Sequence, residues 1–413
     1  MLIRFSVANH QCFAAPVTID LSHPDAPSTP CRLALIAGAG ATGKSALMRS
    51  LGLLRSLTLA GPRAPLPIAA YPFSDLGPTQ LRITVRQDGL DWHYELDVTP
   101  QQIVAERLAT CPAGSEGAPR VLFSRTQSAP GRPPVIDLGS GDISASDQGR
   151  LRLVAQSTRP EQPFLHEALR RGAPLFLPLG IWLRDRLQLL LPEAKLVGLA
   201  ARAARDPAFL AFLRSFLADA ELGIADLRIH REPVPESYFQ SREEQQDVIA
   251  ALTQFSDSFA DTPEGEMIAD RIGGGPVVDI DRVRLLHSIA GPHGTLAELA
   301  ADDLSGSACR LLHMAPIFYA APPGSTAAPT PIACIDDFSH CLHPALQSAL
   351  LTRFVRDRTL PADRQLIAFL SDSDLAGRLV RQAQAVQPPD DTQPVQLATL
   401  ARSPAGNQLT VVV

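Results

Sequence analysis

The sequence lacks paired cysteines, long apolar runs and an excess of positive charge. Its six cysteines show no Cys-x-x-Cys spacing, so we expect reduced thiols rather than a disulfide framework. The most apolar stretch, Pro174 to Trp182, ends at charged residues and falls well short of the roughly 18 residues that a membrane-spanning helix needs. A net charge of −6 gives no overall positive field toward nucleic acid or an anionic membrane. We therefore expect a cytoplasmic protein with no membrane partner, in which nucleic acid would need a local basic patch.

The N-terminal third has the pattern of strands followed by one helix. Hydrophobic residues are 45% of the 413, which is enough for a sizeable core. Leu2–Val7 and Val17–Leu21 predict two antiparallel strands joined by a turn. The apolar run Arg32–Ala37 predicts a further strand, and leucines at helical spacing predict a helix over Lys44–Leu57. Gln80–Val98 alternates about an Asp-Gly turn, which indicates a β-hairpin.

The middle of the chain has a helical pattern. Leucine and phenylalanine recur at helical spacing in Pro163–Arg171, Ile181–Leu190 and Pro207–Ala220, and the pattern continues over Glu243–Phe259. None of these segments carries a heptad repeat long enough for an extended coiled coil. We predict an inserted, mainly helical domain.

The last third alternates helices with strands. Helices are expected over Ser305–Phe318 and Pro344–Arg356, and strands over Ile332–Ile335 and Gln365–Leu370. Such alternation favours a parallel or mixed sheet. We therefore predict an α/β head made from both ends of the chain. The predicted domains are the N-terminal part of the head at 1–150, the helical insertion at 151–290 and the C-terminal part of the head at 291–413.

A glycine-rich loop stands between the predicted strand at 32–37 and the predicted helix that follows. Its sequence, Gly-Ala-Gly-Ala-Thr-Gly-Lys-Ser, matches the phosphate-binding P-loop. In this pattern backbone N–H groups and the helix N-terminus bind phosphate oxygens, Lys44 reaches the β and γ phosphates, and Ser45 ligates magnesium. The loop predicts a site for ATP or GTP with Mg²⁺. Its residues are Gly38, Ala39, Gly40, Ala41, Thr42, Gly43, Lys44 and Ser45.

Two acidic residues follow the apolar strand Ile332–Ile335. P-loop enzymes hold their magnesium ion with an acidic residue at the end of a neighbouring strand. We predict that Asp336 is this metal ligand, together with Ser45, and that Asp337 is the catalytic residue that orients or deprotonates the attacking water.

The tetrapeptide Leu304-Ser305-Gly306-Ser307 opens the predicted helix before that strand. Ser305 has the side chain of a helix N-cap, and the start of a helix is an anion site. Taken alone, an ordinary capped helix explains this segment equally well.

The order of four motifs resembles that of the ABC-type ATPases of the SMC, RecF and OLD class. These motifs are the P-loop, the tetrapeptide Leu-Ser-Gly-Ser, the strand that ends in Asp-Asp, and Leu342-His343-Pro344. The closest resemblance is to bacterial AAA-labelled ATP-binding proteins of abortive infection and phage defence. The opening Met1 to Asn9, with Phe13, is similar to the first strand and turn of that family. The resemblance covers most of 1–128 and about 296–375.

The resemblance implies a homodimer or higher homo-oligomer that closes on ATP and Mg²⁺. Ser305, Gly306 and Ser307 of one subunit would cap the γ-phosphate held by the P-loop of the other. The resemblance also implies a switch, reset by hydrolysis of ATP, that controls a separate effector in bacterial anti-phage defence, a nuclease or another toxin. This sequence contains no acidic cluster or Cys/His set that marks such an effector.

Five residues depart from the pattern of that family, and two of them, His10 and Gln11, stand in the opening turn where an aromatic and a basic residue are typical. Asp337 stands where glutamate is usual, and its carboxylate is one methylene further from the water, which predicts slow hydrolysis. Ser371 stands where a switch histidine is usual, and a hydroxyl replaces neither the charge nor the second nitrogen of an imidazole. Ser307 takes the place of the second glycine of the signature.

Three other functions stay open. A RecF-like DNA-repair ATPase shares these motifs. A basic patch for a partner or DNA would draw on Arg170, Arg171, Arg184 and Arg186, with Arg202 and Arg205 beyond, although scattered arginines usually only solvate helices. A noncatalytic scaffold that binds nucleotide without turnover is favoured by Asp337 and Ser371. A small-molecule P-loop kinase is disfavoured by the signature that precedes Asp336.

Overall fold

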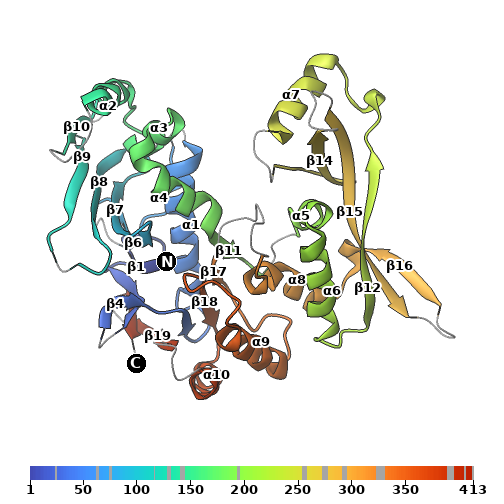
Figure 1. The fold of residues 1–413 in the computed structure, drawn as a ribbon. Helices are drawn as coiled ribbons and strands as arrows, with labels where there is room; N and C mark the ends of the chain where they lie inside the picture. The colour runs from blue at the N-terminus through green and yellow to red at the C-terminus, as the bar shows by residue number, and fades with distance from the viewer. Residues whose placement is uncertain are drawn as a thin grey trace. The chain divides into compact units, whose positions relative to one another are not determined.

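The chain forms two compact units in the computed structural model, which describes residues 1–23, 26–61, 65–73, 77–115, 117–127, 132–139, 145–192, 196–253, 258–271, 278–290, 295–321, 331–387, 395–403 and 406–411. Unit 1 consists of Met1–Leu191, Pro329–Ser339 and Gln347–Val413. Unit 2 consists of Pro192–Ala328 and His340–Leu346. Figure 1 shows the elements of both units. No helix among the described residues is long and apolar enough to cross a membrane.

One sheet of unit 1 is antiparallel and has the strand order β10-β9-β8-β7-β6-β1-β2. The strands are β1 (Leu2–Ala8), β2 (Val17–Asp20), β6 (Thr79–Gln87), β7 (Leu90–Val98), β8 (Ile103–Pro112), β9 (Arg120–Thr126) and β10 (Val135–Leu138). The next two strands in the chain, β3 (Ser22–His23) and β4 (Ala26–Pro30), form a separate two-stranded sheet. The predicted antiparallel pair at the start and the predicted hairpin over 80–98 are confirmed.

The second sheet of unit 1 is mixed and has the order β11-β17-β18-β5-β19-β20. The strands are β5 (Leu33–Ala37), β11 (Leu187–Leu190), β17 (Ile332–Ile335), β18 (Gln365–Leu370), β19 (Val395–Ser403) and β20 (Gly406–Val411). The pairs from β11 to β19 are parallel, and β19 with β20 is antiparallel. The residues of β5, β17 and β18 are all buried, as expected for parallel strands covered on both faces.

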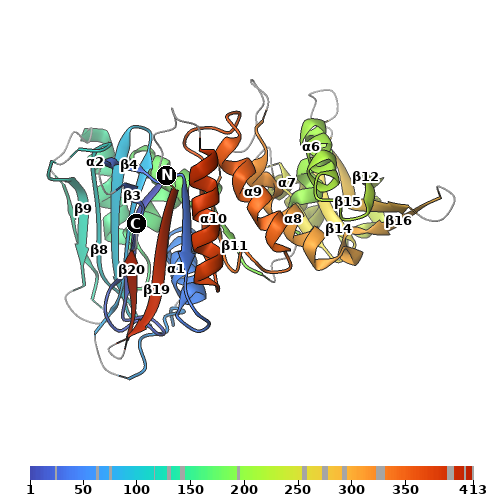
Figure 2. The same ribbon diagram turned by 90° about the horizontal axis from the view of Figure 1, so that it is seen from below.

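The strand-loop-helix unit lies at the centre of this sheet. β5 leads through the glycine-rich loop into α1 (Lys44–Ala60). Leucines of α1 share one buried core with residues of β1, β6, β5 and β18, so the helix is packed against both sheets. On β5 and β19 lies α10 (Ser373–Val386), which Figure 2 shows beside β19. The expected α/β fold with a mixed sheet and a strand-loop-helix unit is confirmed.

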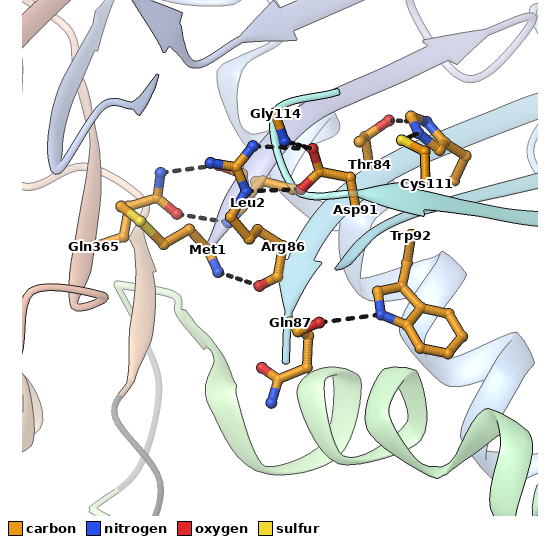
Figure 3. Close-up of polar contacts among 11 residues, drawn as sticks. Met1, Leu2, Thr84, Arg86, Gln87, Asp91, Trp92, Cys111, Gly114 and Gln365 are labelled. Carbon is orange, nitrogen blue, oxygen red and sulfur yellow. Dashed lines mark hydrogen bonds and ion pairs between the residues drawn. The ribbon is translucent and has the colours of Figure 1, made fainter. Parts of the chain in front are cut away.

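A buried glutamine ties the two sheets together. Gln365, at the start of β18, is completely buried, and its Oε1 accepts the backbone N–H of Leu2 at 2.8 Å. Figure 3 shows the contact of Oε1 with Leu2, and Nε2 donates to the carbonyls of Leu2 at 2.9 Å and Cys31 at 2.7 Å. One side chain therefore satisfies three backbone groups.

Gln365→Ala is expected to lower the free energy of unfolding by about 3 kcal/mol, because each buried backbone group left without a partner costs about 1–3 kcal/mol. Urea denaturation would measure the change. Gln156→Ala, at an exposed position of α2 (Ala145–Ser157), is the matched control and should change stability little. Equal effects of the two substitutions would contradict this role of Gln365.

Helices of the segment 145–186 belong to unit 1. They are α2, α3 (Phe164–Arg170), the short helical turn Pro174–Phe176, α4 (Leu177–Ile181) and a π-helical turn at Trp182–Arg186. The helix predicted over Ile181–Leu190 is wrong in its second half, since Leu187–Leu190 forms β11. A short apolar run fits either a helix or a strand, and here parallel pairing with β17 makes it a strand. The boundary between the units thus falls near residue 191 rather than near the predicted residue 151.

An ion pair with no exposed side-chain surface anchors α3. Glu106 accepts the backbone N–H groups of Phe164 at 2.6 Å and Leu165 at 3.0 Å, which are at the helix start, and the hydroxyl of Tyr94 at 3.0 Å. Nη1 of Arg125 lies 3.7 Å from the Glu106 carboxylate. Burial raises the pKa of Glu106, and Arg125 opposes this shift.

Helix α3 also contacts the end of the helix that follows the P-loop. Nδ1 of His166 donates to the carbonyl of Thr58 in α1 at 3.0 Å. Gly61, just after α1, has φ +60, and a Cβ there would lie 2.2 Å from Nε2 of His166. The buried Glu106 carboxylate therefore fixes a helix that touches α1.

Unit 2 combines helices with a sheet that was not predicted. Its helices include α5 (Leu199–Arg205), α6 (Pro207–Ala218), α7 (Arg242–Leu252) and α8 (Gly306–Phe318), with short turns at Glu236–Tyr238 and Ala301–Asp303. Its strands are β12 (Ile224–Pro233), β13 (Ala260–Thr262), β14 (Gly265–Arg271), β15 (Val278–Ala290) and β16 (Leu296–Ala300). β15 pairs with β12, β14 and β16, all antiparallel (Figure 1).

The predicted helices of unit 2 are present, but the insertion differs from its expected composition and extent. α6 and α7 correspond to the predicted helices, although α7 ends at Leu252 and the 254–257 part of the longer prediction lies outside the described residues. β-type character was expected after Gly275, and Val283–Leu285 alternates apolar with charged residues as a half-buried strand does, but the pairing of β15 with β12 and β14 depends on segments far apart in the chain. α8 also belongs to unit 2, whereas the predicted boundaries placed it in the head.

Candidate nucleotide-binding site

Two glycines of the P-loop are required by the backbone around them. Gly43 caps α1 with φ +102, and a Cβ there would lie 2.8 Å from the ring of Phe13 and 2.9 Å from the sulfur of Cys12. A Cβ on Gly38 would lie 2.7 Å from the carbonyl oxygen of Leu400. Gly40 differs, because no atom lies within 4 Å of the position that its Cβ would take. The loop is therefore packed at its two ends and open at its centre.

The side chain of the loop's lysine reaches back to the first residues of the loop. Lys44 is buried, and its Nζ donates to the carbonyl of Gly38 at 2.6 Å and to that of Ala39 at 2.8 Å. Thr42 Oγ1 also donates to the Ala39 carbonyl, at 2.9 Å. Burial lowers the pKa of the Lys44 ammonium, while Asp336 and Asp337 raise it. Lys44 thus interacts electrostatically with both predicted acidic residues.

The two aspartates lie at the same edge of the sheet as the P-loop. β5 and β17 are parallel strands with β18 between them, so the residues that follow them meet at the carboxyl edge. Asp336 is buried, and its backbone N–H donates to the carbonyl of Leu190 at 2.9 Å. Asp337 has a left-handed backbone with φ +44, and its N–H donates to Oδ1 of Asp336 at 3.1 Å.

Ser45 and Ser371, the other predicted residues of the head, also follow strands of the mixed sheet at its carboxyl edge. Ser45 is the second residue of α1 and is partly buried. Ser371 follows β18 at the same carboxyl edge and is exposed. Ser339, which the sequence analysis missed, donates its hydroxyl to Oδ1 of Asp337 at 2.8 Å. Its position two residues after an aspartate in a turn is the one local signal that indicates such a bond.

The signature segment lies in unit 2. Ser305 caps α8 as predicted, because its Oγ accepts the backbone N–H of Ala308 at 3.3 Å. The hydroxyl of Ser307 donates to the carbonyl of Cys341. A Cβ on Gly306 would lie 3.0 Å from the Cys341 sulfur. The start of α8 and the segment His340–Leu346 therefore form one packed piece, with Ser305 and Gly306 exposed.

The arginines of the segment 170–186 that were considered for a basic patch are ion-paired. Arg170 and Arg171 pair with Glu167, Arg184 pairs with Asp185, and the buried Arg186 pairs with Asp363. In the part of the chain that the structure describes, no group of three or more His, Cys, Asp or Glu side chains is arranged to hold a metal. Magnesium needs no such group, since it takes one or two protein ligands beside water and phosphate oxygens.

Comparison with known proteins gives only distant similarities. No protein-family model matches the sequence, and no curated protein is significantly similar to it. Solved structures that match include the two given next, both at low similarity. The SMC head domain from Thermotoga maritima is 12% identical with a TM-score of 0.40, and the match covers 100% of this chain and 99% of that one. The recombination mediator protein RecF-ATPrS of the RecFOR pathway is 12% identical with a TM-score of 0.38, covering 100% and 98%. Neither is close enough to transfer a function.

Proposed function

We propose that the chain binds ATP with magnesium at the P-loop and hydrolyses it slowly, as an ABC-type ATPase. The observation that carries this proposal is that the P-loop, which follows β5, and Asp336 and Asp337, which follow β17, lie at the same carboxyl edge of the mixed sheet. Phosphate suits the start of α1, where backbone N–H groups and the helix dipole favour anions. The open centre of the loop at Gly40 leaves room for such a ligand.

Each polar residue of the site has a role in this proposal. Lys44 exchanges its two carbonyl contacts for phosphate oxygens. Ser45 and Asp336 hold the magnesium ion, and their hydroxyl and carboxylate oxygens are ligands that this ion prefers. When bound, the ion would neutralise charge on the phosphates. Asp337 orients the attacking water and accepts its proton.

We further propose that two subunits close on the nucleotide. The start of α8, with Ser305, Gly306 and Ser307, would contact the γ-phosphate on the P-loop of a second copy. This is supported by the exposure of Ser305 and Gly306 and by their place at the N-terminus of a helix of 13 residues, where the helix dipole favours anions. The assembly would be a homodimer or higher homo-oligomer in the cytoplasm.

The proposed output is control of a separate effector, a nuclease or another toxin, in bacterial anti-phage defence. This step rests on the order of the motifs in the sequence. The noncatalytic scaffold is a second candidate, favoured by the short side chain of Asp337 and by the exposed Ser371 beside it in the sheet. The ion pairs of the arginines give no separate support to the DNA-repair alternative.

Self-association measured with and without ATP and Mg²⁺ tests the proposal. Asp337→Asn is expected to bind ATP, release phosphate only at a small residual rate and accumulate as a dimer or larger assembly in sedimentation. Gly306→Arg should bind ATP and stay monomeric, because it blocks the start of α8. Gly149→Arg, on α2 where a Cβ meets no atom within 4 Å, is the control and should assemble normally.

An assembly state that does not respond to nucleotide in any variant would contradict the dimer. ATP binding by the wild type without release of phosphate would instead favour the scaffold.

A further inference from the structure

The backbone around Asp337 is held on both sides. Asp337 is not glycine, yet it has φ +44, a left-handed conformation that other residues rarely adopt. The Asp337 N–H is bound to Oδ1 of Asp336, and the N–H of Phe338 donates to the carbonyl of Phe369 at 2.8 Å. The side chain of Phe338 is completely buried. The main chain that carries the carboxylate is therefore fixed.

The orientation of the carboxylate is not fixed by the main chain alone. The terminal torsion of aspartate has a broad distribution without sharp staggered minima. In this structure the hydroxyl of Ser339 donates to Oδ1 of Asp337 at 2.8 Å. A hydrogen bond to one oxygen restricts the rotation of the group and so fixes the direction of the other.

We propose that Ser339 is a positioning residue for Asp337 in ATP hydrolysis. This inference rests on the proposed ATPase function. In the reaction, the oxygen of water forms a bond to the γ-phosphorus, and a proton of that water passes to Asp337. The bond from the γ-phosphorus to the β-γ bridging oxygen breaks, and its electron pair stays on ADP.

The reason that orientation matters is the length of the side chain. Aspartate reaches less far than glutamate, so it has few alternative ways to place an oxygen near the water. A misplacement of about 1 Å is enough to cost roughly 100-fold in rate. Ser339 compensates by holding the shorter carboxylate in a single direction.

Steady-state phosphate release by the full chain tests this role. Ser339→Ala is expected to lower kcat about tenfold while the KM for ATP changes less than about twofold, since positioning acts on the chemical step. Ser339→Thr keeps the hydroxyl and should retain most of the activity. Ser348→Ala removes a hydroxyl that bonds Gln382 at 2.6 Å, away from Asp337, and is the control.

A double-mutant cycle separates positioning from a structural effect. In the Asp337→Asn background, Ser339→Ala should add no further loss, because the carboxylate that it orients is already gone. The same fold loss in both backgrounds would overturn the inference, as would wild-type kcat in Ser339→Ala. Ser339→Gly is the second variant, should Ser339→Ala fold poorly.

The two proposals fail in different ways. A wild-type chain that binds ATP but releases no phosphate overturns the proposed hydrolysis and this inference with it. Wild-type phosphate release that is insensitive to Ser339 overturns this inference alone.

Discussion

Glu106→Ala is expected to lower the free energy of unfolding by about 3–5 kcal/mol, the usual cost of removing one partner of a buried ion pair. The substitution leaves the guanidinium of Arg125 without its carboxylate where both side chains are completely buried. It also leaves the N–H groups of Phe164 and Leu165, and the hydroxyl of Tyr94, without their acceptor. The effect is large because charge and hydrogen bonds are lost at once.

Chemical denaturation measures this change, and Glu95→Ala provides a control in the same sheet. Glu95 pairs with Arg82 and Arg107, but its side chain is 36% exposed. Exposed pairs contribute about 0–1 kcal/mol, so the control should be nearly neutral. Losses of equal size in the two variants would contradict the buried role of Glu106.

A double substitution separates the effect of the buried charges on stability from the effect of the lost packing. Glu106→Leu combined with Arg125→Met should regain part of the loss, since it removes both charges together. Full recovery is not expected, because Arg125 also donates to backbone carbonyls of Arg159, Pro160 and Gln162 before α3.

Lys44→Ala is expected to weaken ATP binding at least about 100-fold. Hydrogen bonds to charged groups contribute about 1.5–3 kcal/mol each, and the loss of two from Lys44 to phosphate oxygens amounts to a factor of roughly 100 or more.

Calorimetric titration with ATP and Mg²⁺ measures the loss. Arg49→Ala is the control, since Arg49 lies on the same helix and is exposed, and it should bind ATP like the wild type. Binding by Lys44→Ala at wild-type strength would contradict the assignment of the loop.

The local features of the fold could be predicted because their physical causes are local. The P-loop needs glycine at positions where a Cβ would strike Phe13 or Leu400, and the sequence displays those glycines directly before a helix. The strands that lead to the P-loop and to Asp336, β5 and β17, are continuous apolar runs, which is the pattern of a strand buried on both faces.

Features that depend on distant partners could not be predicted. Leu187–Leu190 became a strand only because β17 lies beside it. Glu106 and Arg125 look like surface residues in the sequence, and only the packing of α3 over their strands buries them. Ser339 carries no motif of its own, and its contact depends on the left-handed turn at Asp337.

Titration of the wild-type chain with ATP in the presence of Mg²⁺ tests the central claim most directly. The proposal predicts saturable binding at a single site per chain that weakens when Mg²⁺ is removed. The absence of saturable binding of either ATP or GTP would contradict the claim that this loop holds a nucleoside triphosphate.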